Sequence, residues 1–396
     1  MNKRNTKRGF TITELVIVIV VIAILAAVLI PTFASLIKKA NQSADIQAAR
    51  QMDVALQGES AAKKPTTLKE VIDILSKAGY DAEGSLKPIT KNHTFYWYKN
   101  FNVIVLANEE ETTPVVLYPT KNKDLEEAFV ADLAKTGAEQ ELFDLEKGFR
   151  QFVKIEVESA NDVVAALSRG QSVTLTKDVE IKQPMSVPAG SNATIDLNGN
   201  TLTTAKSGTD KHEYAVQNAG TVTVTNGTFN SRGIMNNAGS KLIIKDATVN
   251  AMDGNGGGCV RNKKGGEVII EGGTFNVITF SDWNAGNYGG AAGVYNDGGT
   301  ITINGGKFTT VTDAYLVSNV GGGTMTINGG DFTAYRGALA CTDGTITVNN
   351  GKFAVTNDSN GGWVAYAEGA GKIVIKGGTF TTVTDRMFTG NVEDKR

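Results

Sequence analysis

The N-terminal part of the chain contains one long run of apolar residues. From Leu15 to Ile30 every residue is hydrophobic. At about 1.5 Å per residue, a helix over residues 10–30 would be roughly 30 Å long, which matches the hydrocarbon core of a bilayer. One acid, Glu14, lies near the start of this segment. A carboxylate at that depth costs roughly 2.5 kcal/mol or more unless it is paired, so Glu14 indicates a partner inside the membrane.

Apolar side chains then recur at three- and four-residue steps up to residue 57, which predicts that the helix continues beyond the membrane. No glycine interrupts this segment before Gly58, which suits the left-handed residue that ends many helices. We therefore expect one helix over residues 10–57, with residues 10–30 in the membrane and the second half against a soluble head. The apolar positions are Phe33, Ile37, Ala40, Ala44, Ala48, Met52 and Ala55, and the charged positions between them are Lys38, Lys39, Asp45, Arg50 and Asp53.

Residues 58–120 predict a small α/β head. Apolar spacing over 68–75 predicts a short amphipathic helix, and two apolar segments flank Lys99-Asn100, which is a hairpin signal. Residues 115–118 predict a third strand. Residues 121–158 are charged and partly helical, and we expect them to form a connector.

The rest of the chain, residues 159–396, is a repeat. Eight segments place apolar residues seven and five positions before a hydrophobic terminal residue, and a short second strand precedes most of them. The segments are TIDLNGNTL (194–202), GTVTVTNGTF (220–229), SKLIIKDATV (240–249), GEVIIEGGTF (266–275), GTITINGGKF (299–308), GTMTINGGDF (323–332), GTITVNNGKF (344–353) and GKIVIKGGTF (371–380).

Short strands with glycine corners, repeated in this way, predict a parallel β-helix of about eight coils. Successive coils would stack at about 4.8 Å and place the terminal phenylalanines on one another inside. A helix over 159–168, with Ser159 as its N-cap, would cap the first coil. The fold class is therefore mainly β, preceded by the long helix and the small head. We expect an asparagine ladder at one corner, formed by Asn218, Asn237, Asn262, Asn296 and Asn319.

The charge balance excludes one class of function. With 39 basic and 41 acidic residues, the formal net charge is −2, which is not the basic balance of a nucleic-acid-binding protein. His212 with Asp210 and Glu213 is a weak arrangement for a metal, so we expect neither a metal nor a cofactor.

A motif of fixed spacing surrounds the start of the apolar segment. Four basic residues precede a Gly9-Phe10 step, and Glu14 is the fifth residue when counting begins at Phe10. Together with Pro31, the segment resembles the N-terminus of type IV prepilins and pseudopilins over about residues 1–57. The basic residues, which favour a cytoplasmic N-terminus, are Lys3, Arg4, Lys7 and Arg8.

This resemblance implies that a prepilin peptidase removes the leader, residues 1–9, by cutting after Gly9, and that Phe10 becomes N-methylated. In a filament, Glu14 would accept the charged α-amino group of a neighbouring Phe10, which repays the burial of the acid. The precursor would cross the cytoplasmic membrane once and later join other pilin subunits, through their assembly machinery, in a surface filament. The alternative is a plain anchor or a secretory signal cut near Ala26-Ala27, but neither explains Glu14.

Residues 159–396 resemble the right-handed β-helix of the pectate-lyase-like superfamily. That fold serves lyases, hydrolases and adhesins alike, so it does not decide the function. Asp297, Asp313 and Asp343 lie in turns of different coils, whereas polysaccharide hydrolysis needs carboxylates close together. The sequence therefore favours display over catalysis.

The longest coil carries an aromatic insertion over residues 280–293. Phe280, Trp283 and Tyr288 lie among Asn, Asp and Gly there, and Trp363 extends the set. Aromatic faces beside amides are typical of sugar binding, and the alternative is a loop that its own aromatic side chains fold onto the coil.

We therefore expect a minor or tip subunit of a type IV pilus, or a type II secretion pseudopilin, whose β-helix serves adhesion or glycan binding. A bulky head is hard to repeat at every position of a thin filament. The alternative is a membrane-tethered polysaccharide lyase or glycoside hydrolase.

The two cysteines, Cys259 and Cys341, fall in segments three coils apart. That is roughly 14 Å along the axis, and a disulfide tolerates a Cα separation of no more than about 7 Å. We expect two free thiols, and the head lacks the disulfide loop that closes many pilins.

Overall fold

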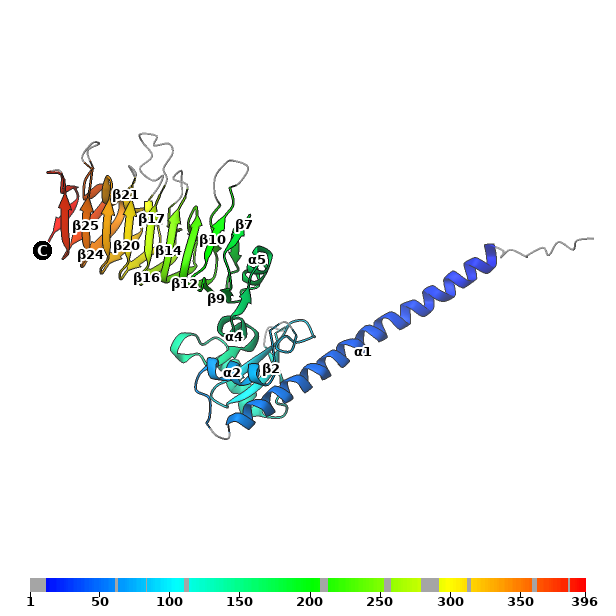
Figure 1. Cartoon of the computed structure of the whole chain (residues 1–396). Coiled ribbons are helices and arrows are strands. Elements are labelled where there is room, and N and C mark those ends of the chain that lie inside the picture. Colours follow the sequence, from blue (N-terminus) through cyan, green and yellow to red (C-terminus); the bar gives the residue numbers. More distant parts are fainter. Residues whose placement is uncertain are drawn as a thin grey trace, which may run out of the picture. The chain divides into compact units, whose positions relative to one another are not determined.

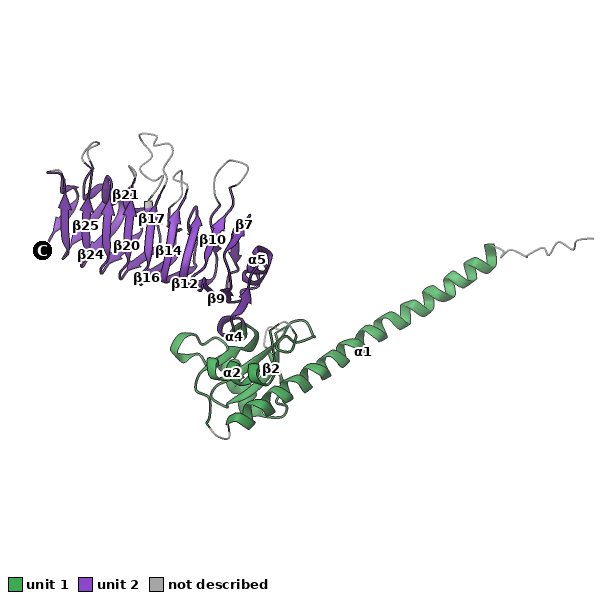
Figure 2. Cartoon of the chain, in the orientation of Figure 1, with its two compact units in different colours: residues 1–149 green, residues 150–396 purple. Residues whose placement is uncertain are grey.

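The computed structural model describes residues 12–60, 63–82, 84–109, 114–206, 213–252, 258–278, 292–311, 315–357, 362–383 and 385–396. The chain forms two compact units, Met1–Phe149 and Arg150–Arg396 (Figure 2). The first unit holds the long helix and a small head, and the second is a parallel β-solenoid (Figure 1). The predicted fold class is confirmed.

Helix α1 (Ile12–Ser60) has 49 residues and includes Pro31. It continues past Gly58, where the sequence predicted its end. The reason lies in contacts of its last turn with the head: Gln57 Nε2 donates to the carbonyl of Asn102 at 2.6 Å, and Asn102 Nδ2 donates to Ser60 Oγ at 3.3 Å. Tertiary hydrogen bonds therefore override the preference of glycine for a helix end.

The head contains an antiparallel sheet of β1 (His93–Tyr98), β2 (Val103–Asn108), β3 (Val115–Tyr118) and β4 (Leu142–Asp144). Their order is β3-β2-β1-β4. The helical elements are α2 (Leu68–Lys77), α3 (Lys123–Asp132), the short 3₁₀ helix η1 (Gly137–Glu139) and α4 (Leu145–Phe152). A capping box formed by Thr67 and Glu70 starts α2. The buried core includes Trp97, Tyr98 and Phe129.

The face of α1 that packs on the head differs from the predicted one. Its buried residues are Asp45, Ala49, Met52 and Leu56. Of the predicted alanines, Ala48 and Ala55 are half-buried and Ala44 is exposed. The difference arises because Asp45, which the pattern had placed among the polar positions, is buried by hydrogen bonds to the head.

The predicted connector over 121–158 is divided between the two units. Its strand β4 pairs with β1, and Phe143 stacks on Trp97 with ring centroids 5.4 Å apart. Its last strand, β5 (Ile155–Val157), instead pairs in parallel with β6 (Val173–Leu175) of the solenoid. The solenoid therefore begins before Ser159, because short apolar segments on both sides of the connector extend the neighbouring sheets.

The described strands of the solenoid stack in three parallel columns. The ladder column contains β8 (Met185–Val187), β11 (Val216–Asn218), β13 (Ile234–Asn236), β15 (Val260–Asn262), β18 (Ala292–Asp297), β21 (Tyr315–Val320), the first parts of β24 (Gly337–Val348) and β26 (Ala365–Ile375), and β28 (Phe388–Gly390).

The threonine column contains β5, β6, β9 (Asn192–Asp196), the first parts of β12 (Thr221–Ser231) and β14 (Lys241–Ala251), β16 (Glu267–Ile270), β19 (Thr300–Ile303), β22 (Thr324–Ile327), the second parts of β24 and β26, and β29 (Val392–Asp394). The phenylalanine column contains β7 (Val179–Ile181), β10 (Thr201–Thr204), the second parts of β12 and β14, β17 (Thr274–Val277), β20 (Lys307–Thr310), β23 (Asp331–Ala334), β25 (Lys352–Val355) and β27 (Thr379–Thr382).

The solenoid core follows the predicted register over about 8 turns. The terminal residues of all eight repeat segments, from Leu202 to Phe380, pair in one row. Along this row Phe308 stacks on Phe275 at 4.7 Å and on Phe332 at 4.5 Å, with nearly parallel rings. Helix α5 (Ala160–Ser168), capped by Ser159, contributes to the core at the first coils.

The asparagine ladder passes through Asn236 and not through Asn237. Asn236 is in register with Asn218 and Asn262. Asn218 Nδ2 donates to Asn236 Oδ1, and Asn236 Nδ2 donates to Asn262 Oδ1, both at 2.8 Å. Asn237 instead belongs to the turn, where its carbonyl lies 2.6 Å from Ser240 Oγ. Asn236 lies two positions after the inward Ile234, as Asn262 lies two positions after Val260, so alternation along the strand directs Asn236 inward. The remaining ladder residues are Asn296 and Asn319.

Candidate functional site

The first part of α1 exposes apolar side chains in every direction. Val16, Ile17, Val18 and Ile19 are consecutive, and each is between 49% and 58% exposed. Helices on the surface of a globular protein bury one stripe, whereas this segment offers no polar face to water. Its most apolar window has a mean hydropathy of 3.2 and none of it is buried. Such a helix is stable only when lipid or other apolar helices surround it.

Glu14 interrupts this apolar surface in the first turn of α1. The predicted processing residues Gly9 and Phe10 lie outside the described residues. Glu14 is thus the part of the predicted processing and assembly motif that the structure places.

Two acids join the second half of α1 to the head. Asp45 is 2% exposed, and its carboxylate accepts hydrogen bonds from the backbone amides of Ile89 at 2.7 Å and Thr90 at 2.9 Å. Asp53 accepts from the amide of Ile104 and from the hydroxyl of Tyr118, both at 3.1 Å. Burial, reinforced by Asp53, raises the pKa of Tyr118 to about 12, so the phenol stays protonated and donates. The sequence pattern missed this role, because it treats charged helix positions as solvated.

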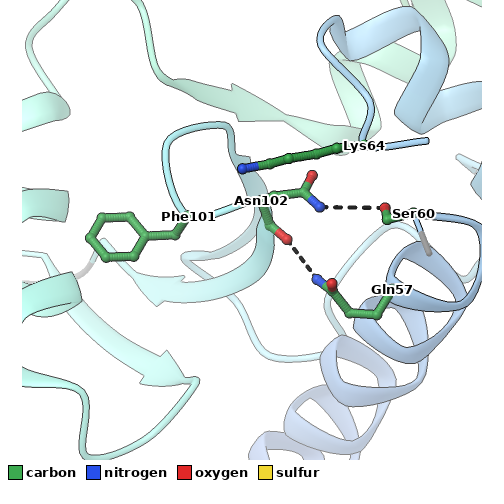
Figure 3. Close-up of a pocket in the computed structure, with 5 residues that line it drawn as sticks. All are labelled: Gln57, Ser60, Lys64, Phe101 and Asn102. Carbon is green, nitrogen blue, oxygen red and sulfur yellow. Dashed lines mark hydrogen bonds between the residues drawn. The ribbon is translucent and has the colours of Figure 1, made fainter. Parts of the chain in front are cut away.

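A shallow pocket of about 320 Å³ lies beside the end of α1, lined by Gln57, Ser60, Lys64, Phe101 and Asn102 (Figure 3). Asn102 has a φ of 50°, and its side chain is held on both ends, since Trp97 Nε1 donates to its Oδ1 at 3.3 Å. Its polar atoms are therefore used within the chain. We assign this cluster to holding the helix on the hairpin and not to a ligand.

The predicted sugar-binding residues are only partly within the described chain. Phe280, Trp283 and Tyr288 lie outside it. Trp363 is half-buried just before β26, and the Arg386 guanidinium lies 5.8 Å from its ring centroid. A cation over a tryptophan face is an attractive contact, so one face of this ring is already used.

Of the acids predicted as solvated turn residues, the structure describes Asp297 and Asp343, and they belong to different coils. Asp297 is in register with Val320, and Asp343 with Ala370. Asp313, Asp210 and His212 lie outside the described residues. Within the described parts of the chain, no group of three or more His, Cys, Asp or Glu residues is placed to hold a metal ion.

Both cysteines are free and buried. Cys341 takes the ladder position after Asn319, as the sequence predicted. Burial raises the pKa of Cys259 to about 12 and raises that of Cys341 as well. These thiols behave as small apolar residues and not as nucleophiles.

Comparison with known proteins bears on the helix. Residues 4–30 match the family model described as the prokaryotic N-terminal methylation motif. The chain carries a prepilin-type N-terminus. This motif fits a membrane-anchored precursor that a prepilin peptidase processes and that assembles with other pilin subunits. No curated protein and no solved structure matches the chain. The resemblance of the solenoid to pectate-lyase-like proteins therefore stays a prediction.

Proposed function

We propose that the protein is a minor or tip subunit of a type IV pilus, or a pseudopilin, that displays its β-solenoid at the cell surface for adhesion or glycan binding. The observation that carries the proposal is the continuity of the methylation motif with a helix that is apolar on all sides. In this proposal the precursor crosses the cytoplasmic membrane once, with its N-terminus in the cytoplasm. After cleavage at Gly9, α1 moves into a filament core.

The proposal gives Glu14 the role of pairing with the N-methylated amino group of Phe10 in a neighbouring subunit. Both charges would be buried, and each would compensate the other. Glu14→Gln should leave cleavage intact and reduce incorporation into filaments. The reason is that an amide keeps the size of the side chain but loses its charge.

Mass spectrometry of surface filaments tests the proposal, with N-methyl-Phe10 as the expected N-terminus. Glu59→Gln is the matched control, since Glu59 is also an exposed acid on α1 and lies at the opposite end of the helix. An intact leader on surface-exposed protein would contradict processing. Equal incorporation of the two variants would contradict the role of Glu14.

Display is favoured over catalysis by the outward side chains of the ladder column. In register they include Met235, Arg261, Tyr295, Ser318 and Ala340. A glycosidase needs two carboxylates flanking its bond, and this row offers aromatic, basic and small side chains instead. Release of reducing ends from pectin or related polymers by the full chain would favour the enzymatic alternative.

A further inference from the structure

The outward side of the ladder column carries an ordered set of side chains. Arg261, Tyr295, Ser318, Ala340 and Tyr366 are in register on successive coils, and we name them the tyrosine row. Each lies one position before a residue of the inward ladder row, so alternation along the strand directs it outward. Two tyrosines therefore lie three coils apart, with two small residues between them.

The aromatic rings of this surface are held by contacts within the chain. The Arg261 guanidinium lies 4.7 Å from the ring centroid of Tyr295, and the ring of Tyr366 stacks on Tyr315 at 6.0 Å. Gly337 makes room for Tyr315, because a Cβ there would lie 2.2 Å from Tyr315 Cε1. Rings fixed before binding lose little conformational entropy when a ligand arrives.

Ser318, in the middle of the row, gives an independent indication of a ligand. It points outward and yet is 2% exposed. Its Oγ has no hydrogen-bond partner among the described residues. A buried hydroxyl without a partner is costly, and native structures hold few of them. The buried asparagines of the ladder, one position away, are all hydrogen bonded. We propose that the tyrosine row is a binding site for a neutral, pyranose-containing saccharide, with Ser318 hydrogen-bonded to a sugar hydroxyl between the two tyrosines.

The chemistry of the row fits this class of ligand. Aromatic faces pack on the C–H face of a pyranose ring, and its hydroxyl groups both donate and accept. The Ser318 hydroxyl can both donate to and accept from a sugar hydroxyl, and the Arg261 guanidinium can donate to one. The carboxylate of Glu368, which already accepts a hydrogen bond from the Tyr366 hydroxyl, can accept from a sugar hydroxyl as well. Burial raises the pKa of Tyr295, so its phenol stays neutral at physiological pH. Because a cation and a carboxylate both border the row, a neutral sugar suits it better than a polyanion.

This inference rests on the proposed glycan-binding function and places it on the ladder column instead of on the insertion over 280–293. The test uses the full chain in detergent micelles on a printed array of neutral and acidic pyranose oligosaccharides. We expect binding to neutral oligosaccharides, and we expect Tyr295→Ala and Tyr366→Ala each to weaken it about tenfold. Ser318→Ala should weaken binding roughly fivefold. It should not lower the thermal midpoint of the free protein, because alanine removes the unsatisfied hydroxyl.

Thr326→Ala is the matched control, since Thr326 is a half-buried outward residue of the threonine column. If Ser318→Ala and both tyrosine variants bind neutral sugars as well as wild type does, the tyrosine row is not the binding site, although glycan binding itself stands. Binding to acidic oligosaccharides alone would overturn the neutral class. No binding to any sugar would overturn the site and the glycan role together, while filament assembly is decided separately by Glu14→Gln.

Discussion

Replacing Asn262 by alanine tests how much the buried ladder stabilises the solenoid. Asn262 is fully buried, and its Nδ2 donates to Asn296 Oδ1 and to the carbonyl of Gly266, both at 2.9 Å. Its Oδ1 accepts from Asn236 Nδ2 at 2.8 Å. The exposed asparagine Asn328 is a matched control, because it donates to Asn304 and accepts from Asn349 at the same 2.8 Å.

The expected magnitude follows from what each substitution leaves unpaired. Asn262→Ala deprives one buried acceptor, Asn296 Oδ1, of its donor, whereas the Gly266 carbonyl keeps the backbone amide of Thr300 at 2.9 Å. Asn236 Nδ2 keeps acceptors, since the carbonyls of Ser240 and Glu267 lie 3.2 Å and 3.0 Å away. At about 1–3 kcal/mol for one unsatisfied buried group, the loss should be about 1–3 kcal/mol. Asn328→Ala should cost less than about 1 kcal/mol, because water replaces the lost bonds.

Urea denaturation followed by circular dichroism measures the global loss of the two variants. Because stacked coils need not unfold in one step, hydrogen exchange of β13, β15 and β18 gives the local loss. Faster exchange confined to these strands and their neighbours in Asn262→Ala is the expected result. Equal losses of stability for Asn262→Ala and Asn328→Ala would refute the argument that burial makes the hydrogen bonds of the ladder more stabilising than the same bonds at the surface.

Two further predictions concern the core and the head. Phe308→Ala should lower the free energy of unfolding by about 3–5 kcal/mol, because it removes a fully buried ring between two others. Thr302→Ala, on the outward side of the same coil, should cost less than about 1 kcal/mol. Equal shifts of the urea midpoint in the two variants would contradict the register. Hydrogen bonds, first from the Thr66 amide and then from Lys63, lower the pKa of Glu70 from 4.5 to about 2, so its stabilising effect is present above pH 5 and is lost as the pH falls toward 2. The thermal midpoint of the Glu70→Gln variant should therefore fall less over this range than that of wild type, and an equal fall in both proteins would contradict the role of Glu70.

The fold was largely predictable because its signals are periodic. The length of one apolar segment predicts the membrane-spanning part of α1. The repeated alternation of apolar residues is enough to predict that Phe275, Phe308 and Phe332 lie in register. The prediction failed at Asn237, although the same alternation selects Asn236, which lies two positions after the inward Ile234 just as Asn262 lies two positions after Val260.

The contacts that join α1 to the head could not be predicted. Asp45 and Asp53 bind backbone amides from segments about 45 to 50 residues away, and such partners leave no periodic trace. The role of Gly337 could not be predicted either, because it depends on the ring of Tyr315, which the preceding coil places beside it. The burial of Ser318 and the missing partner of its hydroxyl are likewise visible only in the folded coil.

The direction of the hydrogen bonds between coils has a mechanical consequence. Because the described strands between the first and last coils pair with the coil before and the coil after them, these bonds run along the solenoid axis. A pull on the last coil along this axis loads the bonds of that coil first, and the coils behind it remain intact until it peels away. Each released coil adds its extended chain, at roughly 3.3–3.6 Å per residue, to the length between the two ends. Under tension the domain would therefore lengthen in steps of one coil, and each step would dissipate mechanical energy.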